Sequence, residues 1–313
     1  MKTTSESMRV IFMGTPEFAV GSLQILVEND VNVVAVITAP DKPKGRGKSL
    51  ATSPVKDYAV LQGIPVLQPT NLKNESFLEE LESYKADLQV VVAFRMLPVV
   101  VWDMPPKGTF NLHASLLPQY RGAAPINWAI INGETKTGVS TFFLQHEIDT
   151  GKIIFQEEEE IREDDTVGDL YDRLMKKGAN LVLKTIRAIA SGNYNETPQV
   201  ESGNLKKAPK IFKETCKIDW DNSARDIYNF VRGLSPYPAA WALVGDKSFK
   251  IFETAIVNSD KKLRPGEFDT DKKSYLNVGT NEGIIGIVSL QPQGKRRMHV
   301  KDFLAGNASF FDK

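Results

Sequence analysis

The sequence predicts an α/β protein whose first part is a Rossmann-like, open and mostly parallel sheet with helices on both faces, followed by a small β-barrel domain. Three observations support this fold class. Continuous apolar runs alternate with helical segments up to residue 192. A polar, proline-containing stretch follows, and short β segments at close spacing then occupy the C-terminal third.

The first unit of the predicted sheet is a strand over residues 9–13, a helix to about residue 29 and a second strand over residues 31–38. Gly14 ends the first strand, Thr15 can cap the helix, and Pro16 suits a first helical position. Because both strands are uniformly apolar, we expect them to be buried and parallel. The single glycine does not make a G-x-G-x-x-G fingerprint, so a nicotinamide dinucleotide is not expected.

The remaining elements follow from the same periodicities. Helices are expected over residues 54–63, 75–84, 125–133, 166–192 and 223–234, and strands over residues 65–67, 86–93, 108–113, 139–144 and 152–156. The C-terminal β segments cover residues 240–244, 249–256, 275–278 and 283–290. We therefore expect a first domain over residues 1–192, a linker over 193–208 and a second domain over 209–313.

Composition narrows the functional class. Lysine and arginine number 39, as do aspartate and glutamate, and no long apolar run or apolar leader occurs, which predicts a cytoplasmic protein without membrane segments. The single cysteine, Cys216, excludes an internal disulfide and is expected to be a buried structural thiol. No cysteine and histidine cluster has metal-ligand spacing, so no metal is expected.

The stretch from Thr109 to Gly122, TFNLHASLLPQYRG, has the character of a catalytic site. Side chains two apart share a strand face, so Asn111 and His113 project together while Phe110 and Leu112 face the core. An apolar loop follows directly. Asp149 lies in a second loop, between the strands expected over residues 139–144 and 152–156.

Residues 39–54 form a basic segment with three prolines that we expect to be an exposed, mobile loop. Its cations, Lys42, Lys44, Arg46 and Lys48, are interleaved with glycines, and we expect them to contact a nucleic acid. A Walker motif is excluded because the required glycine is replaced by Lys42. A second basic surface is expected from Lys206, Lys207, Lys210, Lys213, Lys295, Arg296, Arg297 and Lys301.

The motif HASLLPQYRG, preceded by Asn111 and followed by IDTG at residues 148–151, resembles the folate-dependent formyltransferases. The continuation RGAAPIN resembles the branch of that family that acts on methionyl-tRNA. The likeness runs from MGTPEFA at residues 13–19 to SLQPQGKR near the C-terminus. It departs from the family at residues 94–97, where the loop is shortened and carries Arg95.

This resemblance implies a set of roles. The donor would be 10-formyltetrahydrofolate, the acceptor the α-amine of methionine on initiator methionyl-tRNA, the process translation initiation, and the second domain an OB-like barrel. Asn111, His113 and Asp149 would be catalytic. The folate site would include Ser115, Leu116, Leu117 and Pro118, and the basic loop would contact the tRNA acceptor stem, with Arg46 at the position of a functional arginine.

The residues themselves permit this chemistry. Asn111 and His113 can donate hydrogen bonds to an oxygen that becomes negative, while Asp149 can relay protons. His146 and His299 fit no catalytic motif and are interpreted as structural, and the acidic residues 157–160 as a solvated edge. Two alternatives stay open: a formyltransferase for a small amine, such as glycinamide ribonucleotide or an amino sugar, and a non-catalytic tRNA-binding protein. A monomer is expected.

Overall fold

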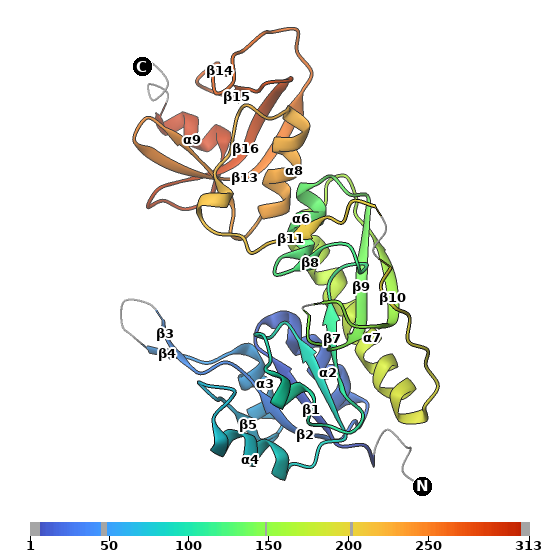
Figure 1. The fold of residues 1–313 in the computed structure, drawn as a ribbon. Coiled ribbons are helices and arrows are strands. Elements are labelled where there is room, and N and C mark those ends of the chain that lie inside the picture. The colour runs from blue at the N-terminus through green and yellow to red at the C-terminus, as the bar shows by residue number, and fades with distance from the viewer. Residues whose placement is uncertain (1–6, 45–48, 148, 201–202, 308–313) are drawn as a thin grey trace. The chain divides into compact units, whose positions relative to one another are not determined.

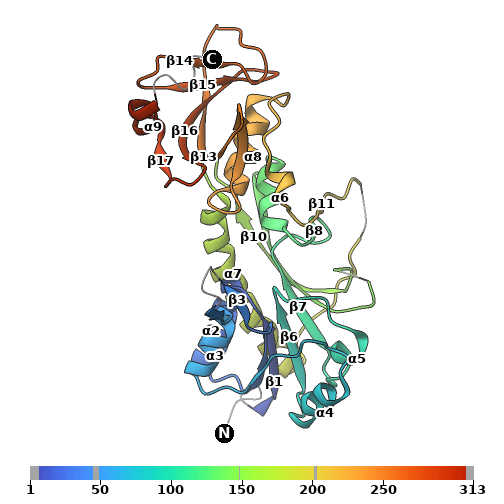
Figure 2. The same ribbon diagram turned by 90° about the vertical axis from the view of Figure 1, so that its left-hand side faces the viewer.

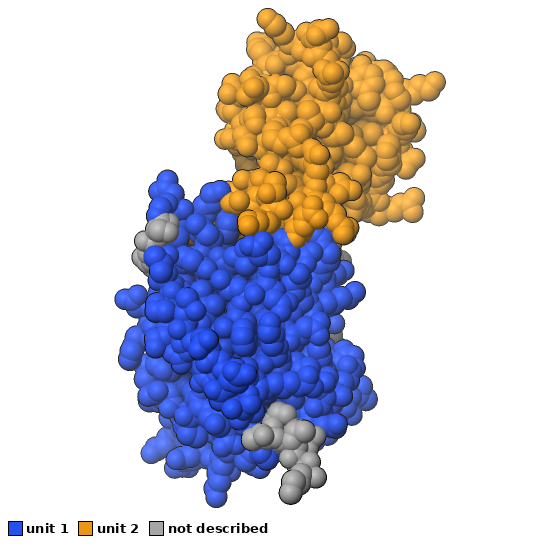
Figure 3. All heavy atoms as spheres, turned by 90° about the vertical axis from the view of Figure 1, so that its right-hand side faces the viewer, with its two compact units in different colours: residues 1–121, 138–159, 171–206 blue, residues 122–137, 160–170, 207–313 orange. Residues whose placement is uncertain are grey.

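The computed structural model describes residues 7–44, 49–147, 149–200 and 203–307 of the 313-residue chain. The chain forms two compact units, coloured separately in Figure 3. The first unit comprises residues 1–121, 138–159 and 171–206, and the second comprises residues 122–137, 160–170 and 207–313. Each unit is described by itself below, and the domain limits expected from the sequence stay a prediction.

The first unit is built on a seven-stranded sheet with strand order β10-β9-β7-β6-β1-β2-β5 (Figure 1). Its strands are β1 (Val10–Gly14), β2 (Val33–Ile37), β5 (Val66–Leu67), β6 (Leu88–Val92), β7 (Thr109–His113), β9 (Lys136–Phe143) and β10 (Ile153–Glu160). Pairing is parallel from β5 to β7, and β7 pairs antiparallel with β9. The predicted mostly parallel sheet is confirmed.

The order of the strands reverses beside β1. The chain continues from β1 to β2 and β5 on one side, then returns to place β6 and β7 on the other. Such a reversal leaves a crevice outside the carboxyl ends of the two strands that flank it, which is where ligands bind in open α/β sheets. Gly14 ends β1 at this point, and a Cβ on it would lie 2.6 Å from that of Ala19.

Helices cover both faces of this sheet, and Figure 2 shows α2 and α3 on one side with α4 and α5 on the other. Their bounds are α2 (Glu17–Glu28), α3 (Pro54–Leu61), α4 (Glu75–Ser83), α5 (Val99–Trp102) and α7 (Val167–Ser191). Ile11 and Met13 of β1 are buried with Phe77 and Leu81 of α4. On the opposite face, Gly178 of α7 lies against Leu112 of β7.

The acidic run at residues 157–160 lies at the edge of the sheet, as expected, with Glu158 and Glu160 exposed, but its other two carboxylates are paired. It is the end of β10, whose alternation turns every second carboxylate toward α7. Glu159 is bonded by Arg173 at 2.8 Å and by Lys177 at 2.9 Å, and Glu157 lies 3.4 Å from Lys184. The run therefore attaches an edge strand to a helix through ion pairs.

The second unit contains an antiparallel sheet with order β12-β13-β16-β15-β14, and β17 also pairs with β16. The strands are β12 (Ala240–Val244), β13 (Lys247–Val257), β14 (Phe268–Thr270), β15 (Leu276–Gly279), β16 (Ile284–Pro292) and β17 (Met298–His299). The helices are α6 (Pro125–Ile131), α8 (Ala224–Leu234) and α9 (Val300–Asn307), and short β8 (Arg121–Gly122) pairs with β11 (Lys207–Ala208). The predicted C-terminal β domain is confirmed.

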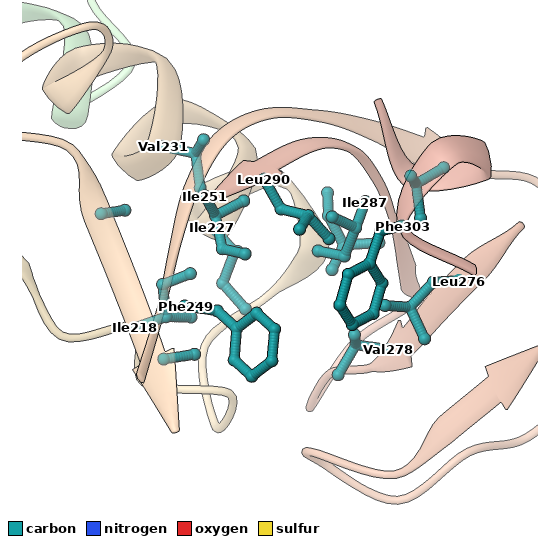
Figure 4. Packing of buried hydrophobic residues seen from close by; sticks show 14 of the residues in the cluster. Ile218, Ile227, Val231, Phe249, Ile251, Leu276, Val278, Ile287, Leu290 and Phe303 are labelled. Carbon is teal, nitrogen blue, oxygen red and sulfur yellow. The ribbon is translucent and has the colours of Figure 1, made fainter. Parts of the chain in front are cut away.

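The core of the second unit lies between this sheet and the helices α8 and α9 (Figure 4). Ile227 and Val231 of α8 meet Phe249 of β13, whose ring packs edge-on against Phe303 of α9 with centroids 5.6 Å apart. Cys216 belongs to the same cluster, which confirms its expected burial. Desolvation raises the pKa of this thiol.

Arg232 joins α8 to the segment of residues 160–170 inside the second unit. Its guanidinium donates to the carbonyls of Arg162 and Asp165 at 3.2 and 3.1 Å and, through Nε, to Asn229 at 3.0 Å. The residue is only 9% exposed, and desolvation lowers its pKa. A buried cation is retained here because two backbone oxygens accept from Nη1 and the Asn229 side chain accepts from Nε.

None of the helices within the described ranges is long and apolar enough to span a bilayer.

We expect Arg232→Met to lower the free energy of unfolding by about 2–4 kcal/mol, because two largely buried carbonyls lose their donor. Urea unfolding followed by tryptophan fluorescence measures this difference. Arg225→Met on the same helix is the matched control, since its ion pair with Glu163 is exposed and is worth less than about 1 kcal/mol. Equal losses in the two variants would contradict a special role for Arg232.

Candidate active site

Strand β7 presents the two polar side chains that the sequence singled out. Phe110 and Leu112 are buried at 0% and 3% exposure, whereas Asn111 is half-buried on the opposite face. His113, two residues on, ends the strand and is 6% exposed. The predicted division of β7 into a core face and a polar face is confirmed.

Asn111 is held by the backbone rather than by its side chain. It pairs with Val91 of β6 and with Phe142 of β9, so β7 is fixed from both sides at this residue. Over the part of the chain that the structure describes, its side-chain amide forms no hydrogen bond. A half-buried amide with open donor capacity suits a ligand oxygen.

A hydrogen bond 2.8 Å long between Nε2 of His113 and the carbonyl of Tyr120 orients the imidazole. A carbonyl can only accept, so Nε2 carries the proton in the neutral ring and Nδ1 presents a lone pair. Tyr120 adopts a left-handed φ of 59°, and its own N–H donates to the carbonyl of Lys206 at 2.7 Å. The turn that orients the imidazole is thus itself held in place.

Hydrogen bonds within the loop and from β9 and β10 hold the apolar loop after β7 in place. Ser115 is fully buried and donates to the carbonyl of Gln119 at 2.6 Å, while Ser140 of β9 donates to the carbonyl of Ser115 at 2.6 Å. Gln156 of β10 donates to the carbonyl of Leu117 at 2.9 Å. Ser115 and Leu117 therefore hold the loop together.

Of the four residues expected to form the folate site, Leu116 and Pro118 are the half-buried ones, and Leu117 is 4% exposed.

Asp149 lies in the loop between β9 and β10 with a left-handed φ of 56°. The loop returns closely past β9, because a Cβ on Gly151 would lie only 1.6 Å from the carbonyl oxygen of Phe143. The side chain of Gln199 donates to the carbonyls of Asp149 and Gly151, both at 2.8 Å. Its oxygen accepts from Nε and Nη2 of Arg121 at 3.0 and 2.7 Å.

Gln199 therefore brings together two segments that are far apart in the sequence. Arg121 directly follows Tyr120, whose carbonyl holds His113, so hydrogen bonds connect the Asp149 loop with the turn beside the imidazole. Sequence reasoning missed Gln199 because it lies in a polar stretch interpreted as a linker. No local pattern reveals its partners, which are 78 and 50 positions away.

Part of the basic segment that was expected to be a mobile loop has regular structure. Its stems pair as two short antiparallel strands, β3 (Lys42–Lys44) and β4 (Ser49–Ala51), with Lys42 opposite Ala51. Lys42 is exposed. Arg46 and Lys48 lie outside the described residues.

Side chains close the base of this hairpin. The buried hydroxyls of Thr38 and Ser53 are hydrogen-bonded at 2.7 Å, and Ser53 also caps α3. Asp41 accepts from Gln68 at 2.8 Å and from Lys56 at 2.5 Å. These two hydrogen bonds, that from Gln68 first, lower the pKa of Asp41, so its carboxylate remains charged well below neutral pH.

The shortened loop after β6 is tied to the chain beyond β5. Arg95 donates to the carbonyls of Thr70, at 3.1 Å, and Pro69, and Met96 is 73% exposed.

The other two histidines make contacts away from His113. His146 stacks edge-on with Trp102, and Nδ1 of His299 accepts from the backbone N–H of Lys301.

Comparison with known proteins gives two family matches. Residues 8–186 match the family described as formyl transferase, and residues 210–308 match the formyl transferase C-terminal domain. Similar proteins named methionyl-tRNA formyltransferase include one from Bacteroides fragilis, 53% identical over 309 residues, and one from Parabacteroides distasonis, 55% identical over 311 residues. The alignments cover 96% of this chain and 95% and 96% of those proteins.

Solved structures share the fold at lower identity. An N-formyltransferase from Helicobacter canadensis, in complex with folinic acid and dTDP-3-aminofucose, aligns with a TM-score of 0.66 at 23% identity, covering 91% of this chain and 99% of that one. HypX from Aquifex aeolicus, in complex with tetrahydrofolic acid, gives 0.65 at 20% identity. That alignment covers 96% of this chain and 47% of HypX, so the chain spans about half its length.

Replacement of Gly151 by alanine should displace the Asp149 loop, because the new methyl group has no space beside the Phe143 carbonyl. We expect the free energy of unfolding to fall by about 1–3 kcal/mol, as is typical of overpacking. Thermal unfolding measures the change. Gly306→Ala, where no atom lies within 4 Å of the added Cβ, controls for the substitution itself, and an undisturbed Gly151→Ala protein would show that the loop is not confined.

Proposed function

The chain belongs to the formyl transferase family, and on that premise we propose that it transfers the formyl group of 10-formyltetrahydrofolate to the α-amino group of methionine on initiator methionyl-tRNA. One observation carries the proposal: the likeness to proteins of that name extends over both matched domains, at more than half identical residues. The product would serve translation initiation.

The residues around β7 fit a folate donor. Leu116 and Pro118 are partly exposed on a loop that Ser140 and Gln156 hold rigid, which suits the flat ring of a folate. Ser115 and Leu117 would contribute by fixing the shape of that wall. When bound, the folate supplies the formyl carbon and leaves with a proton on its nitrogen.

Asn111 would stabilise the charge that develops. As the amine nitrogen bonds to the formyl carbon, the formyl oxygen becomes negative and needs donors already in position. The half-buried amide of Asn111, which no described residue engages, would donate to this oxygen. The strand pairs on both sides of Asn111 keep its backbone from moving, so the donor is preorganised.

His113 and Asp149 would accept and return the protons that move during the transfer. The amine must lose one proton and the departing folate nitrogen must gain one, so the transfer is balanced without any other reactant. Because Nε2 of His113 is committed to the Tyr120 carbonyl, its Nδ1 is the atom that can take up and return a proton. Asp149 would accept the amine proton, directly or through water, or stabilise the charged imidazole.

The basic hairpin and the basic residues of the second unit would bind the tRNA. Lys42, Lys44, Arg46 and Lys48 are our proposed contacts to its phosphates, which attract lysine and arginine irrespective of base sequence. The clamp at the base of the hairpin, formed by Asp41 with Gln68 and Lys56, would hold the strands β3 and β4 in place.

The proposal is tested by offering the protein 10-formyltetrahydrofolate with initiator methionyl-tRNA, glycinamide ribonucleotide or a nucleotide-linked amino sugar. We expect formyl transfer to the tRNA alone. Replacing Lys42, Lys44, Arg46 and Lys48 by glutamine should raise the KM for tRNA and flatten its dependence on salt. Transfer to a small amine alone would overturn the proposal, and tRNA binding without any transfer would indicate a non-catalytic protein.

Asn111→Ala should reduce kcat by about 10²- to 10³-fold, the usual effect of removing one oxyanion donor. Asp149→Asn should also reduce kcat, most strongly below the ordinary pKa range of an α-amine, about 7.7–8.0, where the amine must still be deprotonated. Rates measured at saturating folate and tRNA across pH provide the check. Wild-type rates in both variants would refute these roles.

A further inference from the structure

A stretch of the chain between the two family matches packs on the site of the first unit. We call residues 194–200 the strap. Thr197 forms two backbone hydrogen bonds with Ile153 at the start of β10, of 2.8 and 2.9 Å, and Glu196 is ion-paired with Lys152 at 2.9 Å. The ring of Tyr194 packs against Phe143 of β9, with centroids 5.9 Å apart. The strap is therefore attached to both strands that flank the Asp149 loop.

Gln199 uses the whole hydrogen-bonding capacity of its amide. An amide offers two N–H donors and one oxygen with two lone pairs. Nε2 donates to the carbonyls of Asp149 and Gly151, and Oε1 accepts from Nε and Nη2 of Arg121. A planar group with four such contacts has one available orientation. It joins the carbonyls of Asp149 and Gly151 to the guanidinium of Arg121, which no regular secondary structure connects to them.

The Asp149 loop requires such support. A non-glycine residue at a φ of 56° is uncommon, and such a conformation persists when the surrounding structure fixes it. The two hydrogen bonds from Gln199 go to the carbonyl of Asp149 itself and to that of Gly151, two residues later. That backbone conformation sets the direction of the Cα–Cβ bond of Asp149, so an anchor on the carbonyls limits where the carboxylate can lie.

We propose that Gln199 is a positioning residue for the reaction: it fixes the Asp149 carboxylate relative to the turn of Tyr120 and Arg121 that orients His113. The proposal rests on the proposed function, because it concerns the groups assigned to proton transfer there. Gln199 itself touches no reacting atom. It acts by holding the Asp149 loop and Arg121 in one frame.

Three variants separate the contacts of Gln199. Gln199→Ala removes all of them. Gln199→Glu keeps the shape and an acceptor for Arg121 but cannot donate to the carbonyls of Asp149 and Gly151. Glu196→Gln removes the exposed ion pair on the same strap and is the matched control.

We expect Gln199→Ala and Gln199→Glu to lower kcat about 10- to 100-fold, since small misplacements of reacting groups have effects of that order. The KM for tRNA should be unchanged, and Glu196→Gln should behave as the wild type. Normal kcat in both Gln199 variants would overturn the proposal. Loss in Gln199→Ala alone would also overturn it, because pairing with Arg121 would then be the only contact that matters.

A second measurement does not depend on the substrate. Amide hydrogen exchange over residues 149–153 should be faster in both Gln199 variants than in Glu196→Gln, because the anchor of the loop is lost. Unchanged exchange would overturn the proposed anchoring even in an active enzyme. If the wild type transfers no formyl group to tRNA but exchange still accelerates, the proposed function fails while the anchoring of the loop stands.

Discussion

The register of β7 is the constraint on which the site depends. Successive side chains of a strand alternate between faces, so a slip of one residue would exchange Asn111 and His113 with Phe110 and Leu112 between the two faces of the sheet. Parallel pairing with β6 and antiparallel pairing with β9 both fix this register. At the start of the strand, the buried hydroxyl of Thr109 donates to the carbonyl of Trp102 at 2.6 Å and adds a third restraint. Packing of Phe110 and Leu112 on one face therefore fixes the positions of Asn111 and His113 on the other.

Beyond β7 the site is held by side chains that bond to backbone carbonyls. Ser140 and Gln156 fasten the loop after β7, Gln199 fastens the Asp149 loop, and Tyr120 offers its carbonyl to His113. Loops can adopt shapes that strands and helices do not permit, but their buried polar groups still need partners. Side-chain amides and hydroxyls supply these partners here, and they confer rigidity on segments without regular structure.

Local sequence patterns predicted the features that depend on neighbouring residues, such as the faces of a strand and the order of strands and helices. The period of a strand placed Asn111 and His113 on one face, and apolar runs alternating with helical segments identified the parallel sheet. Contacts between segments far apart in the sequence leave no local pattern, so the sequence did not predict the roles of Gln199 and Gln156. Composition did not reveal two further contacts. Two acidic residues of β10 pair with cations of α7 that lie more than ten positions away, and the stems of the basic segment pair as a hairpin.

The clamp beneath the basic hairpin has a consequence for how this surface can change. Thr38 with Ser53, and Asp41 with Gln68 and Lys56, hold the base of the hairpin together. The entropic cost of closing a loop grows only slowly with its length once its ends are held. The number and charge of the residues between β3 and β4 can therefore change at little cost in loop-closure entropy, while the sheet stays the same.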